Sequence, residues 1–192
     1  MIDLNYILAS SSQRRQELLH RIIDNFDIVV SDFDEDSVSF DGNVEEYVIR
    51  LAKGKALSIK KCLEKDAIII GGDTVVVLEN EILGKPKSEK EAFEMLKKLS
   101  SKTHRVYSGI VVINTYNNTI EEEAIYTEVT MSNLSDEEIL EYIKSGEPMD
   151  KAGAYGIQGF GGVFIERING CYYNVVGLPL NLLNKMIKKV RK

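Results

Sequence analysis

Residues 66–78 read Asp66-Ala67-Ile68-Ile69-Ile70-Gly71-Gly72-Asp73-Thr74-Val75-Val76-Val77-Leu78. Nearly all of its residues are apolar and many are β-branched, which is typical of a strand buried on both faces of a sheet. Asp73 interrupts the run, and an unpaired carboxylate buried there costs about a few kcal/mol or more. We therefore expect a compensating partner for Asp73.

Two glycines precede Asp73. Glycine weakens a strand and usually marks a bulge or the close approach of a ligand. One interpretation makes Asp73 a metal-binding or proton-accepting carboxylate, and we favour it. The alternative ends the strand at Gly71-Gly72, places Asp73-Thr74 in a solvated bend and starts a second strand at Val75.

A long helix is predicted over residues 44–63, because apolar residues recur there at helical spacing. Lys55 falls inside the apolar stripe of this helix, whereas Lys53 and Lys60 lie on the opposite side. A lysine in such a position most often extends its ammonium group to the solvent. The sharper hypothesis directs Lys55 into a cleft toward phosphate.

The rest of the chain alternates helices with hairpins. Ser88-Glu91 and Ser135-Glu138 are spaced as capping boxes at the start of two helices, and residues 178–190 predict a C-terminal helix. Strands over residues 105–115 and 120–131 predict one hairpin, and strands on either side of Asn169-Gly170 predict another. Parallel and antiparallel signals coexist, so we expect an α/β fold with a mixed, twisted sheet and flanking helices, in one domain over residues 1–192.

The first helix begins at Ser12-Gln13-Arg14-Arg15. With Ser12 as the N-cap, Arg14 and Arg15 occupy the second and third positions, beside unpaired backbone N–H groups and the positive end of the helix dipole. A bound anion would turn this unfavourable placement into a favourable one, and phosphate is the obvious candidate. In the alternative, Ser12 only caps the helix and both arginines point into water.

Composition limits the classes of function. The formal net charge of −6 argues against a nucleic-acid-binding face and against an anionic membrane partner. Cys62 and Cys171 are far apart and form no zinc pattern, and with only two histidines we do not expect a metal site of nitrogen and sulfur ligands, so a metal here would be a hard divalent cation. The acidic run Asp34-Glu35-Asp36 would usually be a solvated turn, but a hard divalent cation needs such ligands. The N-terminus has no basic segment before an apolar run, and we expect a cytoplasmic protein.

Two loops carry polar residues. Residues 150–162 are rich in glycine and include Gln158, which suits a loop that lines a pocket, although a cluster of β-turns would look similar. Lys85 follows a predicted strand and precedes Pro86 in a rigid loop.

Taken together, these segments resemble the Maf family, the septum-formation-inhibitor-like proteins that act as nucleoside triphosphate pyrophosphatases. The resemblance covers essentially the whole chain, and several blocks in the same order are far more specific than any one of them. It implies a Maf/inosine-triphosphatase-like fold with two lobes around a central cleft. The blocks are residues 8–19, Asp34-Glu35, residues 51–56, Gly72-Asp73-Thr74, Gly84-Lys85-Pro86 and residues 150–162.

The resemblance implies hydrolysis of a nucleoside triphosphate between its α and β phosphates, with a divalent cation such as Mg²⁺, Mn²⁺ or Co²⁺. The branch that carries Gln158 is similar to the dTTP/UTP pyrophosphatases, and a modified pyrimidine triphosphate is an alternative substrate. A homodimer is also implied. The rival hypothesis is a nucleotide-binding regulator of cell division or septum formation that does not turn its ligand over.

Residue roles follow from the resemblance and from the chemistry of a triphosphate. Asp73 corresponds to the proton acceptor of the family, and Arg14, Thr74 and Gln158 to residues linked to substrate choice. We expect Glu35 and Asp73 to hold the cation. The family usually has proline where Gln13 stands, so a looser first turn is expected. The expected phosphate-binding residues are Ser12, Arg14, Arg15, Lys55 and Lys85.

Overall fold

The computed structural model describes residues 4–192. The chain divides into two compact units: the first comprises Met1–Asp73, Ser108–Ile125 and Gly177–Lys192, and the second comprises Thr74–Tyr107 and Tyr126–Val176. The strands are β1 (Asn5–Leu8), β2 (Asp27–Ile28), β3 (Ala67–Leu78), β4 (Glu81–Leu83), β5 (Thr103–Asn114), β6 (Thr119–Met131) and β7 (Ile165–Asn169).

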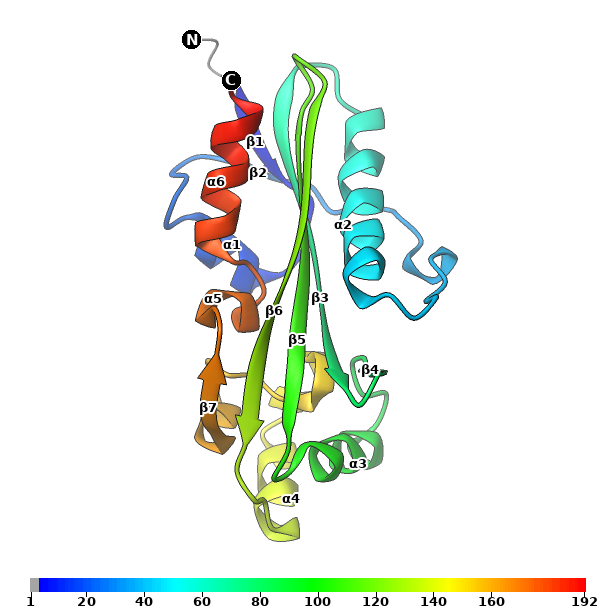
Figure 1. Cartoon of the computed structure of the whole chain (residues 1–192), viewed down its shortest axis with the longest axis vertical. Coiled ribbons are helices and arrows are strands. Elements are labelled where there is room, and N and C mark those ends of the chain that lie inside the picture. The colour runs from blue at the N-terminus through cyan, green and yellow to red at the C-terminus, as the bar shows by residue number, and fades with distance from the viewer. Residues whose placement is uncertain (1–3) are drawn as a thin grey trace. The chain divides into compact units, whose positions relative to one another are not determined.

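These strands form one seven-stranded sheet in the order β2-β1-β3-β5-β6-β7, with β4 paired to β3 (Figure 1). β1 is parallel to both β2 and β3, whereas β4 is antiparallel to β3 and β7 is antiparallel to β6. The predicted mixed sheet is therefore confirmed, as is the hairpin of β5 and β6 around residues 115–118.

β3 is continuous through Gly71, Gly72 and Asp73. Its first half pairs in parallel with β1, in a register that sets Leu8 opposite Ile70, and the side chains of residues 67–70 are buried. The alternative in which the strand ends at the two glycines is wrong.

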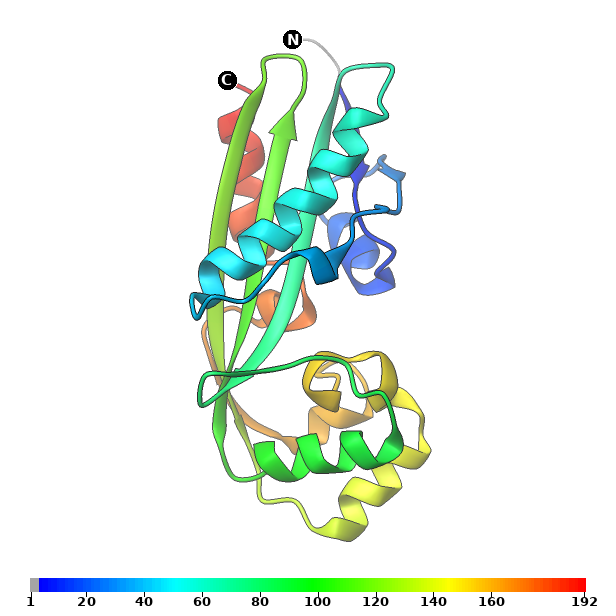
Figure 2. The same ribbon diagram turned by 90° about the vertical axis from the view of Figure 1, so that its right-hand side faces the viewer.

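Three helices belong to the first unit: α1 (Gln13–Leu19), α2 (Val44–Lys61) and α6 (Leu180–Val190). Figures 1 and 2 show α2 along one face of the sheet and α1 and α6 on the other. The helix predicted over residues 44–63 is confirmed, and its Ala52, Ala56 and Ile59 share a core with Ile7 and Ile69 of the sheet.

The second unit contains α3 (Glu89–Leu99), α4 (Asp136–Lys144) and α5 (Tyr172–Val176), with 3₁₀ turns at Glu147–Asp150, Ala152–Ala154 and Phe160–Phe164. α3 packs against α4, and Leu96, Val129 and Ile139 lie in their common core.

The two predicted capping boxes differ. At α4, Ser135 Oγ accepts from the backbone N–H of Glu138 while the Glu138 carboxylate accepts from that of Ser135, which is a complete box. At α3, Ser88 Oγ accepts from Glu91 N–H, but the Glu91 carboxylate accepts from Lys87 N–H, one residue further back. The full capping box predicted at Ser135-Glu138 is therefore confirmed, and the one predicted at Ser88-Glu91 is not.

The predicted hairpin around Asn169-Gly170 is wrong. β7 ends at Asn169 and the chain then enters α5 in place of a second strand. Thr127 Oγ1 accepts from Cys171 N–H at 3.0 Å, and the buried amide of Asn174 donates to Thr127 Oγ1 and to Val106 O. These contacts with β5 and β6 fix the chain as a helical turn, and β7 takes β6 as its antiparallel partner.

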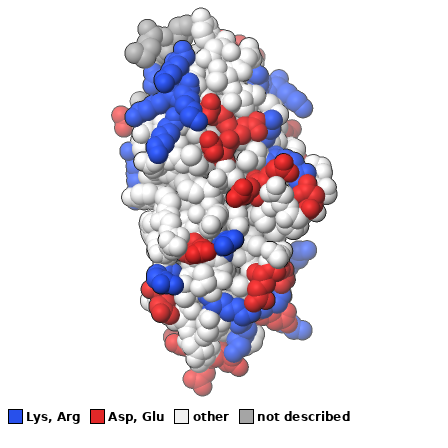
Figure 3. Space-filling view, in the orientation of Figure 1, with Lys and Arg blue, Asp and Glu red and all other residues white. Residues whose placement is uncertain are grey.

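On the face seen in Figure 3, acidic and basic side chains are interspersed, with a group of basic ones over the C-terminal end of α6. Within residues 4–192, no helix has the length and apolar character needed to cross a membrane.

Candidate functional site

The close approach of α2 to the sheet depends on two glycines. A Cβ on Gly71 would overlap the carbonyl oxygen of Ala52, and one on Gly109 would overlap that of Val48. Gly71 therefore accommodates the backbone of a helix, which corrects the prediction that it marks a bulge or a bound ligand. Because α2 lies this close to the sheet, Lys55 on its sheet-facing side reaches β3.

Lys55 pairs with two carboxylates. Its Nζ lies 2.6 Å from Oδ1 of Asp73 and 3.1 Å from Oε1 of Glu35. The Lys55 and Asp73 side chains are only 13% and 10% exposed, whereas that of Glu35 is 56% exposed. Lys55 is thus the partner expected for Asp73, and the explanation in which it extends into solvent is wrong.

Glu35 is placed by the segment before it. Ser31 Oγ is 2.7 Å from Ser58 Oγ on α2, and the ring of Phe33 occupies the space that a Cβ on Gly54 would fill. Glycine inside a helix costs about 1 kcal/mol relative to alanine, so the tertiary contact offsets a local penalty at Gly54. Asp34 caps the 3₁₀ turn Glu35–Ser37, which begins at Glu35.

Arg15 lies on the other face of β3. Ser12 is the N-cap of α1 as predicted, accepting from Arg15 N–H. The Nε of Arg15 donates to the carbonyl of Gly177 at 2.9 Å and its Nη1 to Ser10 Oγ at 3.3 Å. Gly72 faces this guanidinium group, since a Cβ there would lie 3.4 Å from Arg15 Nε. Arg15 is therefore held by the fold, and the alternative in which it points into water is wrong.

Electrostatic coupling links Arg15 to the carboxylates. Burial lowers the pKa of Arg15 and the charge of Arg14 lowers it further, while the charges of Asp73 and Glu35 oppose the shift. Arg15 stays charged, because the ordinary pKa of arginine lies far above neutrality.

Two neighbours of this cluster were not singled out from sequence. Burial and the carboxylates of Asp73 and Glu35 raise the pKa of Tyr47, which places its hydroxyl in the same electrostatic environment. The only sequence signal was that Tyr47 shares the apolar stripe of α2 with Lys55. Ser10 is buried and accepts from Arg15, but the sequence shows it only as one serine of a run.

The remaining predicted residues, Thr74, Lys85 and Gln158, belong to the second unit. Thr74 is half-buried on β3, Lys85 is exposed after β4, and Gln158 is exposed in a turn. Gly153 N–H donates to the carbonyl of Gly84 at 3.0 Å, so the fold joins the loop of Lys85 to the glycine-rich segment that carries Gln158.

Over residues 5–190 the chain matches the family described as Maf-like protein. The chain belongs to the Maf family. It is 59% identical over 188 residues to the dTTP/UTP pyrophosphatase of Clostridium beijerinckii, covering 98% of this chain and 100% of that protein. It is 60% identical over 183 residues to the dTTP/UTP pyrophosphatase of Clostridium novyi, covering 95% of this chain and 96% of that protein.

A solved structure shares the architecture of this Maf protein. The HAM1 protein from Coxiella burnetii superposes with a TM-score of 0.51 at 13% identity, covering 97% of this chain and 100% of the other. The likeness bears on the fold alone, and it confirms the expected α/β fold class with a mixed sheet and flanking helices.

A divalent cation would find two carboxylates in the first unit of this Maf protein. Glu35 and Asp73 both reach Lys55 Nζ, so their oxygens lie close together. Among residues 4–192, no group of three or more Asp, Glu, His or Cys side chains lies close enough together to hold a metal ion. The donor set fits Mg²⁺, which is commonly held by one or two carboxylates together with substrate phosphates and water.

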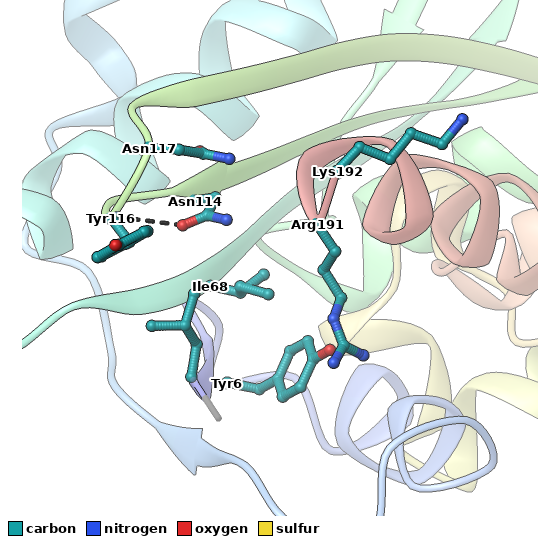
Figure 4. Close-up of a pocket in the computed structure, with 8 residues that line it drawn as sticks. Tyr6, Ile68, Asn114, Tyr116, Asn117, Arg191 and Lys192 are labelled. Carbon is teal, nitrogen blue, oxygen red and sulfur yellow. Dashed lines mark hydrogen bonds between the residues drawn. The ribbon is translucent and has the colours of Figure 1, made fainter. Parts of the chain in front are cut away.

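A cavity of about 300 Å³ lies elsewhere in the first unit of the Maf chain, lined by residues that include Tyr6, Ile68 and Asn114. Figure 4 shows the guanidinium group of Arg191 beside the Tyr6 hydroxyl, and the backbone of Tyr116 bonded to Asn114. None of the predicted site residues lines this cavity.

Proposed function

We propose that this Maf protein is a nucleoside triphosphate pyrophosphatase that acts on dTTP and UTP and releases pyrophosphate and the nucleoside monophosphate. Relatives that bear this name are 59% and 60% identical to the chain over nearly its whole length. The observation that carries the proposal is the cluster of Lys55, Asp73 and Glu35, in which a basic group and two acids converge.

In the proposed reaction Asp73 is the catalytic base. A water molecule attacks the α-phosphorus atom, its proton passes to the Asp73 carboxylate, and the bond to the bridging oxygen breaks as pyrophosphate leaves. Lys55 donates to Oδ1 of Asp73 and so fixes the orientation of the carboxylate. A positioned base of this kind contributes about 10²–10⁴-fold to the rate.

Cationic side chains stabilise the charge that develops on the phosphate oxygens. Arg15 suits this role because Gly177 O and Ser10 Oγ hold its guanidinium group in a fixed orientation. In the proposal Ser12, Arg14, Lys55 and Lys85 contribute further contacts to the phosphate chain.

Glu35 and Asp73 would hold a divalent cation, for which Mg²⁺ is proposed and Mn²⁺ and Co²⁺ are the alternatives. When bound, the cation neutralises part of the charge on the triphosphate.

Gln158 is proposed to read the base, together with Arg14 and Thr74. Its amide can donate to O4 of uracil or thymine while its oxygen accepts from N3–H. The same side chain with its amide flipped would suit cytosine, so the pyrimidine preference rests mainly on the relatives.

The test is a product-resolved panel of dTTP, UTP, CTP, GTP and ATP with Mg²⁺, Mn²⁺ or Co²⁺. The proposal predicts pyrophosphate as the product and dTTP and UTP as the fastest substrates. Orthophosphate as the product would indicate a phosphatase, and a purine turned over fastest would contradict the pyrimidine preference. Binding without turnover under every metal would favour the second candidate, a nucleotide-binding regulator of cell division.

The same panel on Asp73→Asn tests the role of the base. We expect turnover to fall at least about 100-fold while nucleotide binding is retained. Asp24→Asn is the matched control, because Asp24 is an exposed aspartate of the same unit. Full activity of Asp73→Asn would remove Asp73 from the chemistry.

Three finer points belong to the proposal. The proposed place of action is the cytoplasm. Triphosphates of 5-substituted pyrimidines, added to the panel, test whether a modified nucleotide is the better substrate. Sedimentation equilibrium tests the homodimer implied by family membership.

A further inference from the structure

Glu147 precedes the glycine-rich segment (residues 150–162) in the sequence, and the backbone of that segment folds around its carboxylate. It opens the 3₁₀ turn Glu147–Asp150, and its carboxylate accepts three hydrogen bonds. Oε2 accepts from Phe160 N–H at 2.8 Å, and Oε1 accepts from Gly161 N–H at 3.1 Å and from the hydroxyl of Tyr142 at 2.8 Å.

Tyr142 extends the same network to the start of the segment. Its hydroxyl oxygen accepts from Gly156 N–H at 3.1 Å. Its ring packs edge-on against the ring of Phe164, with the two ring centroids 5.1 Å apart. Burial and the bond to Glu147 raise the pKa of Tyr142, so the hydroxyl keeps its proton and remains a donor at neutral pH. One carboxylate and one phenol therefore fix both ends of residues 156–161.

The glycines of the segment are explained by this arrangement. A Cβ on Gly159 would overlap the carboxylate of Glu147, and one on Gly161 would lie 2.7 Å from the hydroxyl oxygen of Tyr142. The chain wraps around the Glu147 carboxylate with no room for side chains on its inner side. Gln158, by contrast, is exposed in the turn between the two anchored ends.

The charge of Glu147 is maintained by the same contacts. Burial acts to raise the pKa of Glu147, but the hydrogen bonds from Tyr142, Gly161 and Phe160, together with the charge of Lys151, outweigh burial and lower the pKa. An ionised carboxylate only accepts hydrogen bonds, which matches three donors that converge on it.

We propose that Glu147 is a positioning residue that sets base selectivity by fixing the turn from which Gln158 presents its amide to the pyrimidine. This inference rests on the proposed function and names a further determinant of its substrate choice. Glu147 acts through Gln158 and takes no part in bond breaking.

Glu147→Gln tests the inference, because it keeps the size of the side chain and replaces one acceptor oxygen with an NH₂ group that faces N–H donors. We expect KM for UTP to rise about tenfold, kcat to change by less than about threefold, and the preference for UTP over CTP to fall. Glu141→Gln, an exposed change on α4, is the matched control and should leave all three values unchanged.

A double-mutant cycle separates positioning from a general structural effect. If Glu147 acts through Gln158, then Glu147→Gln changes selectivity no further once Gln158 is alanine. An equal loss of selectivity in both backgrounds, or a fall in kcat at constant KM, would overturn the inference. Tyr142→Phe removes the hydroxyl that bonds Glu147 and Gly156 but keeps the ring against Phe164. This variant replaces Glu147→Gln in the test if Glu147→Gln does not fold.

The outcomes also separate this inference from the proposed function. A wild-type protein that releases no pyrophosphate from any triphosphate contradicts both. An active wild type with an unchanged ratio of UTP to CTP turnover in Glu147→Gln overturns the role of Glu147 alone.

Discussion

The ammonium group of Lys55 lies 2.6 Å from Oδ1 of Asp73 and joins α2 to β3 through two nearly buried side chains of opposite charge. The pair explains why each residue was anomalous in the sequence: a lysine in an apolar helix stripe and an aspartate in an apolar strand. Removal of Lys55 leaves the nearly buried carboxylate of Asp73 without its ammonium partner, whereas removal of Asp73 leaves Lys55 with the exposed carboxylate of Glu35.

Lys55→Met should lower the free energy of unfolding by about 3 kcal/mol, since Asp73 then loses its buried cation. Pyrophosphate release should fall at least about 100-fold, because Asp73, the proposed base, is then no longer oriented. Urea unfolding and the product assay measure the two effects. Lys61→Met, at an exposed position at the end of the same helix, is the control. Wild-type stability and activity in Lys55→Met would contradict the role of the pair.

Gly71→Ala and Gly72→Ala should differ sharply in stability. A Cβ on Gly71 meets the backbone of α2, which cannot move aside locally, so we expect a loss of about 2 kcal/mol or more. A Cβ on Gly72 makes an ordinary contact with Arg15 at 3.4 Å, and its effect on stability should be below about 1 kcal/mol. Thermal unfolding compares the two variants. Equal melting temperatures would show that close packing of α2 does not depend on Gly71.

Arg14→Ala and Arg15→Ala should both reduce turnover, and Arg15→Ala should also reduce stability. Arg15 Nε donates to the carbonyl of Gly177, and loss of a charged hydrogen bond costs about 1.5–3 kcal/mol. The structure thus gives Arg15 a role within the fold, in addition to its proposed contact with the phosphates. Chemical denaturation together with the turnover assay measures both effects of Arg15→Ala, and wild-type stability in that variant would refute the role of this hydrogen bond.

Stability should fall in mild acid because of His104. Burial lowers the pKa of this histidine to about 4 in the folded chain, against an ordinary 6.5. As pH falls from 6.5 to 4, the unfolded chain binds a proton that the folded chain does not, so the unfolding free energy decreases by about 3 kcal/mol. His104 Nε2 pairs with the Tyr155 hydroxyl at 2.7 Å, and its buried Nδ1 has no hydrogen-bond partner among residues 4–192.

His104→Gln should flatten the pH dependence of unfolding between pH 6.5 and 4, as followed by urea titrations at several pH values. His20→Gln is the control, because His20 is exposed. An unchanged slope in His104→Gln would show that other groups carry the acid sensitivity.

Periodic segments were predicted correctly because their local signals agree with their tertiary setting. The apolar stripe of residues 44–63 predicted the helix that the structure shows as α2, and the apolar run of residues 66–78 predicted the strand β3. At Asn169-Gly170 the local turn signal failed, because Thr127 and Asn174 form hydrogen bonds that favour a helical turn after Gly170. Glu147 was missed for a related reason, since its sequence neighbourhood gives no indication of the backbone N–H groups that converge on it.

Local sequence patterns were enough to predict the mixed α/β fold, the N-cap at Ser12, and the unusual positions of the charged residues Lys55 and Asp73. Those features are set by local periodicity and by the cost of burying charge, which can be inferred from a single chain. Three further features became visible only in the folded chain: the two charges pair, Gly71 makes room for α2, and Arg15 donates to Gly177 O. These contacts join residues far apart in the chain, so their geometry depends on how whole elements pack.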